Sequence, residues 1–276
     1  MSKRPTLVAP PGAIDTHMHI YDTRVPPAPG GPALPGHFPV AAYREVQRRL
    51  GISRAVIVQP NAYVDDNSVT LAAIAELGAD ARGVAVVKPG VTDAELERLT
   101  RGGIRAIRFM TLPGGALGWD VMDALAARVQ PFGWHSIVQL DGRTLPERAA
   151  QIRRLPGRFI VDHVGKFLEP VPPDHAAFKA LLGLLDCARC WIKLSAPYEV
   201  SKAGAPRYED VGALAKELVR AAPERMLWAS NWPHPSVPKE VRPDDADLLD
   251  LLLEWAPDEA TRRKILVDNP AGLYGW

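Results

Sequence analysis

The chain has only two cysteines in 276 residues, and both lie in one Cys-x-x-Cys segment, Cys187 and Cys190. One such pair supplies too few ligands for a four-coordinate zinc site. The residues that follow, WIKLS, have the pattern of a strand. We therefore expect two free thiols packed beside a strand, with a redox or zinc pair as the alternative.

The chain also lacks an excess of charge, because 33 Lys and Arg residues face 32 Asp and Glu residues. Proteins that bind nucleic acid usually carry a basic surplus, so this balance argues against that class. No apolar run reaches the ~18 residues that span a bilayer. The N-terminal segment MSKRPTLVAPPG has no secretory pattern. We expect a cytoplasmic protein that binds neither nucleic acid nor membrane.

The residues that are abundant indicate one globular domain. Hydrophobic residues make up 47% of the chain, which is enough for a large core. A (β/α)8 barrel of ~200–250 residues folds as one domain, so 1–276 is expected to be a single domain. Proline is also abundant, with 27 residues. Since the core excludes wholesale disorder, we expect the prolines in rigid loops, including a Pro/Gly-rich insertion at 25–39.

Apolar runs alternate with helical patterns along the chain. Near-continuous apolar runs are typical of strands buried on both faces of a parallel sheet. Thr92 and Glu95 form a capping box, which predicts the start of one helix. The expected strands are 13–20, 54–59, 82–87, 104–109, 134–140, 158–163, 190–195 and 225–230. The other expected helices are 41–50, 68–79, 120–130, 145–155, 174–186, 210–219, 245–255 and 258–267.

Eight strands, each followed by a helix, predict an α/β fold of the (β/α)8 type, known as a TIM barrel. An open doubly wound sheet is the alternative, but it usually has a Gly-rich phosphate turn after its first strand. Here that place holds HMHIYD. The insertion at 25–39 would then follow the first strand on the catalytic face, as a lid, an oligomer contact or a surface excursion.

Polar residues at the carboxyl end of the first strand are the first candidates for chemistry. Alternation along a strand places Asp15, His17 and His19 on one face. Two imidazoles that point the same way make a good metal-binding pair. Two structural histidines are the alternative.

Other strand ends add candidates, because active sites of these barrels lie at the carboxyl ends of the strands. Arg108, Lys166 and Lys193 are suited to holding carboxylates, with surface ion pairs as the alternative. Asp141 is a candidate base, whereas Asp162 should point away from His163 and have a structural role. The remaining candidates are Gln59, Asn61, Gln139, Ser195, Tyr198, Asn231, Trp232 and His234.

Four segments carry a resemblance to a known family: IDTHMHIYD, VDHVGK, ASNWPHP and DNPAGLYG. Together they resemble the lactone-acting branch of the amidohydrolase superfamily, which contains 2-pyrone-4,6-dicarboxylate lactonases and galactarolactone isomerases. The resemblance extends over residues 12–275 and implies a distorted (β/α)8 barrel. It also implies that His17, His19 and His163 would be the ligands if a divalent metal such as zinc were bound.

The chain departs from the metal-dependent pattern of that superfamily at two places. Gln139 or Asp141 stands where the fifth strand would supply a histidine, and Asn231 stands where the eighth would supply an aspartate. An amide cannot act as the base that activates water. The departures therefore favour an enzyme without a cofactor, with a zinc enzyme as the alternative.

We predict an enzyme that opens a small carboxylated lactone. Histidine-assisted hydrolysis is the first reading, with catalytic residues His17, His19, His163 and Asn231. The substrate-binding residues would be Arg108, Gln139, Lys166, Lys193, Tyr198, Trp232 and His234. A lactone isomerase that uses a substrate hydroxyl as the nucleophile is the second reading. A non-catalytic acid-binding protein on a decayed barrel is the third.

Overall fold

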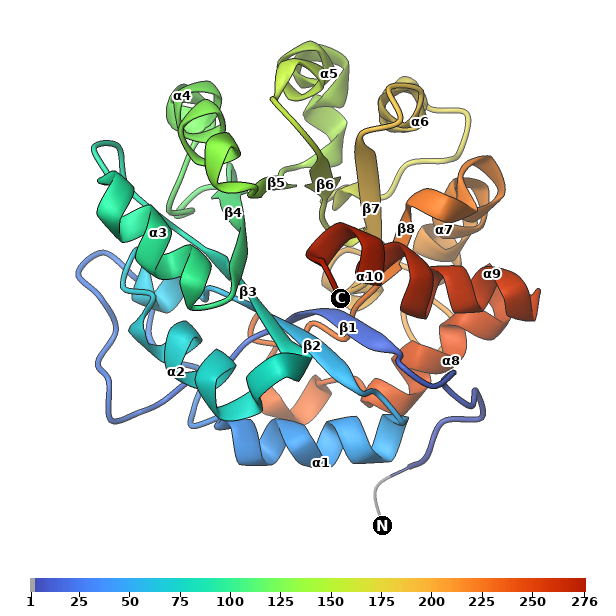
Figure 1. Ribbon diagram of the computed structural model, residues 1–276. Helices are drawn as coiled ribbons and strands as arrows, with labels where there is room; N and C mark the ends of the chain where they lie inside the picture. The colour runs from blue at the N-terminus through green and yellow to red at the C-terminus, as the bar shows by residue number, and fades with distance from the viewer. Residues whose placement is uncertain (1–2) are drawn as a thin grey trace.

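The computed structural model describes residues 3–276, in which eight parallel strands form one sheet in the order β1 to β8. The strands surround a common centre and the helices lie outside them (Figure 1). This arrangement confirms the predicted (β/α)8 barrel. The strands are β1 Ile14–Met18, β2 Arg54–Val58, β3 Ala81–Ala85, β4 Ile104–Met110, β5 His135–Gln139, β6 Phe159–Val161, β7 Cys190–Leu194 and β8 Met226–Trp228.

The helices between the strands agree with the predicted segments. Thr92 accepts a hydrogen bond from the backbone N–H of Glu95 at 3.2 Å, so the capping box begins its helix as predicted. These helices are α1 Val40–Leu50, α2 Ser68–Leu77, α3 Asp93–Arg101, α4 Trp119–Val129, α5 Leu145–Arg154, α6 Ala176–Leu185, α7 Glu209–Ala221 and α8 Asp245–Trp255.

The last helical segment extends beyond its predicted end at residue 267. After α9 (Glu259–Arg263) comes a π-helical stretch, Lys264–Asp268, and then α10, Asn269–Tyr274. Asp268 and Asn269 have helical dihedral angles, so α10 continues the π-helical stretch, and Pro270 lies in the first turn of α10. The helical path therefore continues through the proline of the segment DNPAGLYG and ends at Tyr274.

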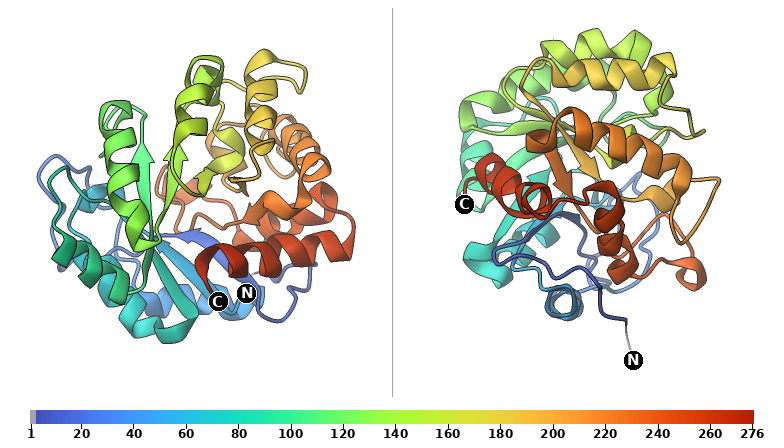
Figure 2. Two further views of the ribbon diagram at one scale, coloured as in Figure 1. Left: turned by 45° about the horizontal axis from the view of Figure 1, so that its top comes forward. Right: turned by 90° about the vertical axis from the view of Figure 1, so that its right-hand side faces the viewer.

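The carboxyl-terminal helix closes the end of the barrel at which the strands begin. Leu273 and Tyr274 pack in one cluster with inward-facing strand residues such as Val56 and Trp191. Arg82 donates to the carbonyl of Gly275 at 3.0 Å. Figure 2 shows the chain end beside the strands from two further sides. The amino-terminal end of the barrel is thus plugged, and a site can open only at the other end.

The first strand contains a β-bulge that corrects one prediction. Asp15 pairs with Ala55 of β2 and Met18 pairs with Ile57, so β1 has one more residue than β2 between these two pairs. The Asp15 carboxylate accepts from the hydroxyl of Tyr43 on α1 at 2.9 Å. The prediction that Asp15 shares a face with His17 and His19 is therefore wrong, because the bulge reverses the alternation.

The barrel closes between β8 and β1 without a strand ladder in the described residues. Thr16 Oγ1 donates to the carbonyl of Trp228 at 2.7 Å, and the N–H of Asn231 donates to the carbonyl of His17 at 2.8 Å. This irregular seam makes the barrel distorted, as the resemblance implied. Two residues that form this seam, His17 and Asn231, are also candidate site residues.

The insertion at 25–39 folds over the carboxyl ends of the strands. Tyr21 and Phe38 form an antiparallel bridge at its base, and Ala28 donates to the carbonyl of Ala62 at 2.9 Å. We call this segment the strap.

Cys187 and Cys190 are free thiols, as predicted. Within residues 3–276, the helices are all too short or too polar to cross a membrane.

Candidate active site

A cavity of about 360 Å³ lies at the carboxyl ends of the strands, where polar side chains from most strands meet. The strap and the loops after β2 and β4 supply apolar walls to it. The lining residues are His19, Tyr21, Pro32, Ala33, Pro35, Asn61, Ala62, Arg108, Met110, Leu112, Pro113, Gln139, His163, Lys166, Glu199, Asn231, Pro235 and Ser236. The strap is thus part of the cavity wall and more than a surface excursion.

The cavity brings together the candidate Asn61 and six of the residues predicted to be catalytic or substrate-binding. These six are His19, Arg108, Gln139, His163, Lys166 and Asn231. Four others are buried outside the lining, namely His17, Lys193, Trp232 and His234, and Tyr198 is partly buried there. The first group can touch a ligand, whereas the second can act only through its neighbours.

A directed chain of hydrogen bonds runs through the two histidines of β1. His19 Nδ1 lies 2.8 Å from the carbonyl of Val58, so that nitrogen must carry a proton. His19 Nε2 is then an acceptor, and His17 Nε2, at 3.2 Å, must donate to it. His17 Nδ1 is left as an acceptor, with the ammonium of Lys193 at 3.1 Å. The contacts thereby fix the tautomer of each neutral ring.

This proton arrangement does not suit the metal that the superfamily pattern implies. The spacing of the two Nε2 atoms would suit two ligands of one ion, but each ligand must offer a lone pair. For His17 Nε2 to do so, the proton would have to move to Nδ1, where Lys193 already donates. Asp162 could accept from Nδ1, yet its oxygen lies farther away, at 3.5 Å. The donor set as built therefore does not fit a divalent ion.

A further set of possible ligand atoms, from His17, Asp162 and His163, lies in the same place. Lys193 Nζ lies 3.1 Å from Asp162 Oδ1 as well as 3.1 Å from His17 Nδ1. The ammonium thus supplies a positive charge among these atoms from within the chain. Lys193 is fully buried below the cavity and does not line it.

Asp162 lies at the centre of the charged layer beneath the cavity. Burial opposes its ionisation, but the charge of Lys193 outweighs this and holds the pKa of Asp162 well below its ordinary value. Arg108 Nε lies 3.6 Å from its other oxygen. The prediction that Asp162 points away from His163 is wrong, because the chain leaves the strand at Val161 and the alternation ends there.

Left-handed turns at the strand ends aim three of the lining residues into the cavity. His163, Lys166 and Asn231 have φ values of 53°, 44° and 58°. Asparagine tolerates this conformation, whereas it costs His and Lys about 1 kcal/mol each. Strain of this kind persists where the surrounding structure demands a particular side-chain position.

Burial keeps the cavity histidines neutral at physiological pH. It lowers the pKa of His163 to about 4, against the opposing charge of Asp162. It lowers the pKa of His19 to about 3, with a smaller contribution from Arg108. His163 Nδ1 is 2.8 Å from Ser195 Oγ, so Nε2 is the nitrogen left for a ligand. A neutral imidazole with a free nitrogen can accept a proton.

The carboxylate of Glu199 is the lining residue that the sequence reasoning missed. It forms an ion pair with Lys166, and it accepts from Ser236 Oγ and, at 3.2 Å, from Asn231 Nδ2. Burial opposes ionisation, but Lys166 outweighs it and the pKa of Glu199 falls to about 2. The signal was available, since Glu199 lies five residues after the end of β7.

The aromatic candidates lie behind the cavity wall. Tyr198 accepts from Asn231 Nδ2 at 2.8 Å and contacts His234 Nδ1 at 3.0 Å. Trp232 packs against the rings of Phe38 and Tyr43, with centroids 5.6 and 5.4 Å away. Tyr198 and Trp232, which were predicted to bind the substrate, therefore lie outside the lining of the cavity. They hold Asn231 and the strap in place.

Asp141 does not reach the cavity either. Its carboxylate accepts from the backbone N–H of Arg143 at 3.1 Å and pairs with the Arg143 guanidinium at 2.6 Å. These contacts cap the short 3₁₀ turn at 142–144. The prediction of Asp141 as a base is wrong, because its oxygens are held by Arg143.

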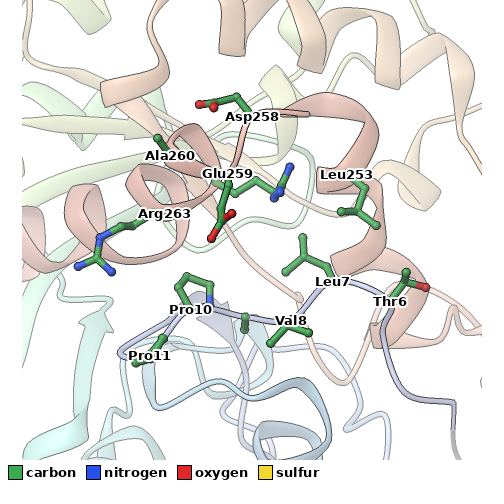
Figure 3. Close-up of a pocket in the computed structure, with 12 residues that line it drawn as sticks. Thr6, Leu7, Val8, Pro10, Pro11, Leu253, Asp258, Glu259, Ala260 and Arg263 are labelled. Carbon is green, nitrogen blue, oxygen red and sulfur yellow. The ribbon is translucent and has the colours of Figure 1, made fainter.

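A larger hollow of about 850 Å³ lies elsewhere, between residues 6–11 and helices α8 and α9 (Figure 3). Residues 6–11 lead into β1, so this hollow is on the side where the strands begin. Asp258 there caps α9 by accepting from the N–H of Thr261 at 2.7 Å. The side chains in Figure 3 are a mixture of apolar groups and helix-surface charges, without the convergent polar groups of the strand-end cavity.

Comparison with known proteins gives the site a context. A sequence profile of the family described as Amidohydrolase matches residues 14–276. A D-galactarolactone isomerase from Agrobacterium fabrum (strain C58) is 40% identical over 273 residues, covering 98% of this chain and 93% of that protein. A 4-sulfomuconolactone hydrolase from Rhizobium radiobacter is 36% identical over 275 residues, covering 96% and 91%.

A ligand-free crystal structure of an Agrobacterium tumefaciens protein has a TM-score of 0.94 and 39% identity, covering 100% of this chain and 98% of that chain. The same barrel therefore extends over both chains from end to end.

Proposed function

This chain belongs to the amidohydrolase family, and we propose that it is an enzyme that opens a small carboxylated lactone in the strand-end cavity. One observation carries the proposal: the same cavity is lined by a buried cation, Arg108, and by a neutral histidine, His163, whose Nε2 is free. Arg108 is suited to the carboxylate of such a ligand. Relatives that cover nearly the whole chain are named as lactone isomerase and lactone hydrolase.

His163 would move the proton. A nucleophilic hydroxyl attacks the lactone carbonyl carbon while its proton passes to His163 Nε2. The ester bond to the ring oxygen then breaks, and His163 returns the proton to that oxygen. Asn231 Nδ2 is occupied by Tyr198 and Glu199, so its Oδ1 is the atom left to accept from a substrate hydroxyl.

The source of the nucleophile separates isomerisation from hydrolysis. Activation of water is usually the task of a carboxylate, but Glu199 is held by three donors and has a pKa of about 2. Asn231 is an amide and cannot replace it. His163 could take a proton from water as well, but Glu199 is not free to position a water molecule. We therefore favour attack by a hydroxyl of the substrate, as in a sugar-acid lactone, and the 40% identity to a lactone isomerase supports this choice.

Hydrolysis is the second candidate, and 36% identity to a named lactone hydrolase supports it. The test is to incubate the protein with D-galactarolactones and follow the products by NMR. A ring-shifted lactone without free diacid supports isomerisation, and free diacid supports hydrolysis. Binding without turnover would support the acid-binding protein instead.

A variant of His163 tests the proposed proton transfer. His163→Asn retains a residue that tolerates the left-handed turn, and general base catalysis contributes about 10²–10⁴-fold. We expect kcat to fall at least about 100-fold. His175→Asn is the matched control, because His175 only caps α6 and asparagine is also a good cap. Equal losses in both variants would contradict the role of His163.

A further inference from the structure

The charged side chains that line the cavity are unequal in number. In the described residues they are two cations, Arg108 and Lys166, and one anion, Glu199. Burial keeps the lining histidines neutral. The lining thus has a single net positive charge, although it offers two cationic groups.

One of the two cations already has its counter-ion. Lys166 and Glu199 form an ion pair whose side chains are only 11% and 7% exposed. Glu199 is held in place from two further sides, by Ser236 and Asn231. A ligand carboxylate that approached Lys166 would therefore come close to a fixed carboxylate.

The other cation is incompletely paired. Arg108 is 4% exposed, and its Nε has no hydrogen-bond partner within residues 3–276. Its contact to Gln139 Oε1 is long, at 3.4 Å, and its contact to Asp162, already paired with Lys193, is 3.6 Å. Arg108 also lines the cavity, so a ligand carboxylate can give the guanidinium the close partner that Asp162 does not.

We propose that Glu199 is a specificity-determining residue that restricts the cavity to ligands with one carboxylate, by occupying Lys166 and repelling a second anionic group. The proposal rests on the proposed function to the extent that the ligand is a carboxylated lactone. Two like charges a few ångströms apart in a poorly solvated cavity repel each other strongly. Arg108 then receives the single carboxylate, and the Lys166 end of the cavity receives the uncharged, hydroxyl-bearing part.

The substitution Glu199→Gln keeps the shape of the side chain and removes its charge. Lys166 would then be free to bind a second carboxylate, while the acceptor for Asn231 and Ser236 is retained. We expect the affinity for a dianion, relative to a monoanion of similar shape, to rise by about tenfold or more. The double variant Glu199→Gln/Lys166→Gln restores the original net charge, so the ratio should return toward its starting value.

Binding is measured by titration calorimetry with two probes, a 2-pyrone monocarboxylate and 2-pyrone-4,6-dicarboxylate. All variants carry His163→Asn, so that turnover does not consume the probes. Ser236→Ala is the matched control, because it removes one hydrogen bond to Glu199 and leaves the charge unchanged. Its ratio of affinities should stay within about twofold of the starting protein. Circular dichroism confirms that each variant is folded.

The inference is supported if the monocarboxylate binds more tightly while Glu199 is present and the ratio shifts only in Glu199→Gln. It is overturned if the monocarboxylate has no advantage, or if Glu199→Gln leaves the ratio unchanged. This measurement does not depend on catalysis. Absence of lactone turnover by the unmodified chain would sink the proposed function alone, whereas an unchanged ratio would sink the charge selection alone.

Discussion

Lys193 is the residue on which the proton arrangement of the site depends. Its ammonium donates toward His17 Nδ1 and pairs with Asp162, both at 3.1 Å. As a consequence, His17 keeps its proton on Nε2 and donates to His19. The His-x-His pair that would otherwise suit a metal becomes a hydrogen-bonded pair. The buried charge of Lys193 thus decides whether the His-x-His pair binds a metal ion or forms a hydrogen bond between its two rings.

Replacing Lys193 with methionine should create affinity for zinc. Without the ammonium, His17 Nδ1 can carry the proton and donate to Asp162, which frees Nε2 as a ligand beside His19 Nε2. Carboxylate–histidine contacts of this kind change metal affinity by about 10–100-fold, so we expect a gain of at least about tenfold. Metal analysis after dialysis against zinc measures it, and ¹⁵N NMR of His17 reports the tautomer.

Lys166→Met is the matched control for this experiment, because it removes the other buried lysine and leaves His17 untouched. It should not change the zinc content or the tautomer of His17. Equal zinc affinity in the unmodified chain and in Lys193→Met would contradict the assignment of Lys193 as the residue that excludes the ion.

Protonation of the cavity histidines should set the acid limit of the protein. The pKa of His163 is lowered to about 4 in the folded chain, from about 6.5 in a model peptide. The unfolded chain therefore binds the proton more readily, and stability falls as the pH drops from about 6.5 toward 4. The share of His163 is about 3 kcal/mol. Urea unfolding at a series of pH values measures this slope, which should be shallower in His163→Asn.

The same shift predicts the acid limb of the pH–rate profile. If His163 accepts the proton, kcat/KM for the lactone should fall with an apparent pKa near 4 instead of near 6.5. A limb near 6.5 would mean that an exposed histidine controls the rate.

At the scale of single elements, the sequence predicted the strands well but not their irregularities. Apolar runs place all eight strands within a few residues of their observed positions. The bulge after Asp15 and the left-handed turn at His163 depend on contacts with distant residues, such as Ser230 with Asp15. Arguments from strict alternation therefore failed at Asp15 and Asp162, where the backbone stops following a regular strand.

The site residues show the same limit. The strand-end rule brought His19, Arg108, Gln139, His163, Lys166 and Asn231 into one cavity. The same rule does not distinguish a polar residue that lines the cavity from one that lies beneath it. Lys193, which is buried beneath the cavity, is an example. Glu199 was not predicted because it lies in the 3₁₀ turn Pro197–Glu199 after β7, where strand alternation no longer indicates which side chain faces the cavity.

The strap is an element whose position can be tested by one methyl group. A Cβ on Gly31 would lie 2.3 Å from the carbonyl oxygen of Ala62, so Gly31→Ala must displace the strap. Pro32 and Ala33 line the cavity, and their displacement should lower kcat/KM by about tenfold or more. The free energy of unfolding should change by less than about 1 kcal/mol, because the strap contributes little to the core.

The control for the strap is Gly272→Ala, since a Cβ there meets nothing within 4 Å. Steady-state kinetics and urea unfolding are measured for both variants. A loss of stability in Gly31→Ala as large as the loss of activity would show that the strap is part of the core instead.

At the scale of the whole molecule, the two ends of the barrel have different tasks. The carboxyl ends of the strands hold the charged cavity, whereas the other end is filled by apolar side chains and covered by α10. The net charge of +1 does not show the local positive charge of the cavity, because most charges are paired elsewhere, within the barrel as Lys193 with Asp162 or on the surface as Arg98 with Glu95. Proline-shaped loops gather at the catalytic end, where Pro32, Pro35, Pro113 and Pro235 line the cavity.

The plugged end makes a prediction about stability that is independent of the chemistry. Tyr274 is 1% exposed, its ring lies 4.8 Å from that of His135, and its hydroxyl is buried without a hydrogen-bond partner in residues 3–276. Tyr274→Ala should cost about 3–5 kcal/mol of unfolding free energy, because it leaves a cavity in the barrel floor. Tyr274→Phe should be neutral or stabilising, since it removes only the unpaired hydroxyl.

Urea unfolding measures the free-energy change of each Tyr274 variant. Steady-state kinetics of the folded variants tests whether the end of the barrel covered by α10 affects the cavity at the other end. Both variants should retain the KM of the unmodified chain, because Tyr274 lies at the opposite end from the cavity lining. A cost below about 1 kcal/mol for Tyr274→Ala would mean that α10 rests on the surface. A change of KM in the folded Tyr274→Phe protein would mean that packing at the floor sets the geometry of the site above it.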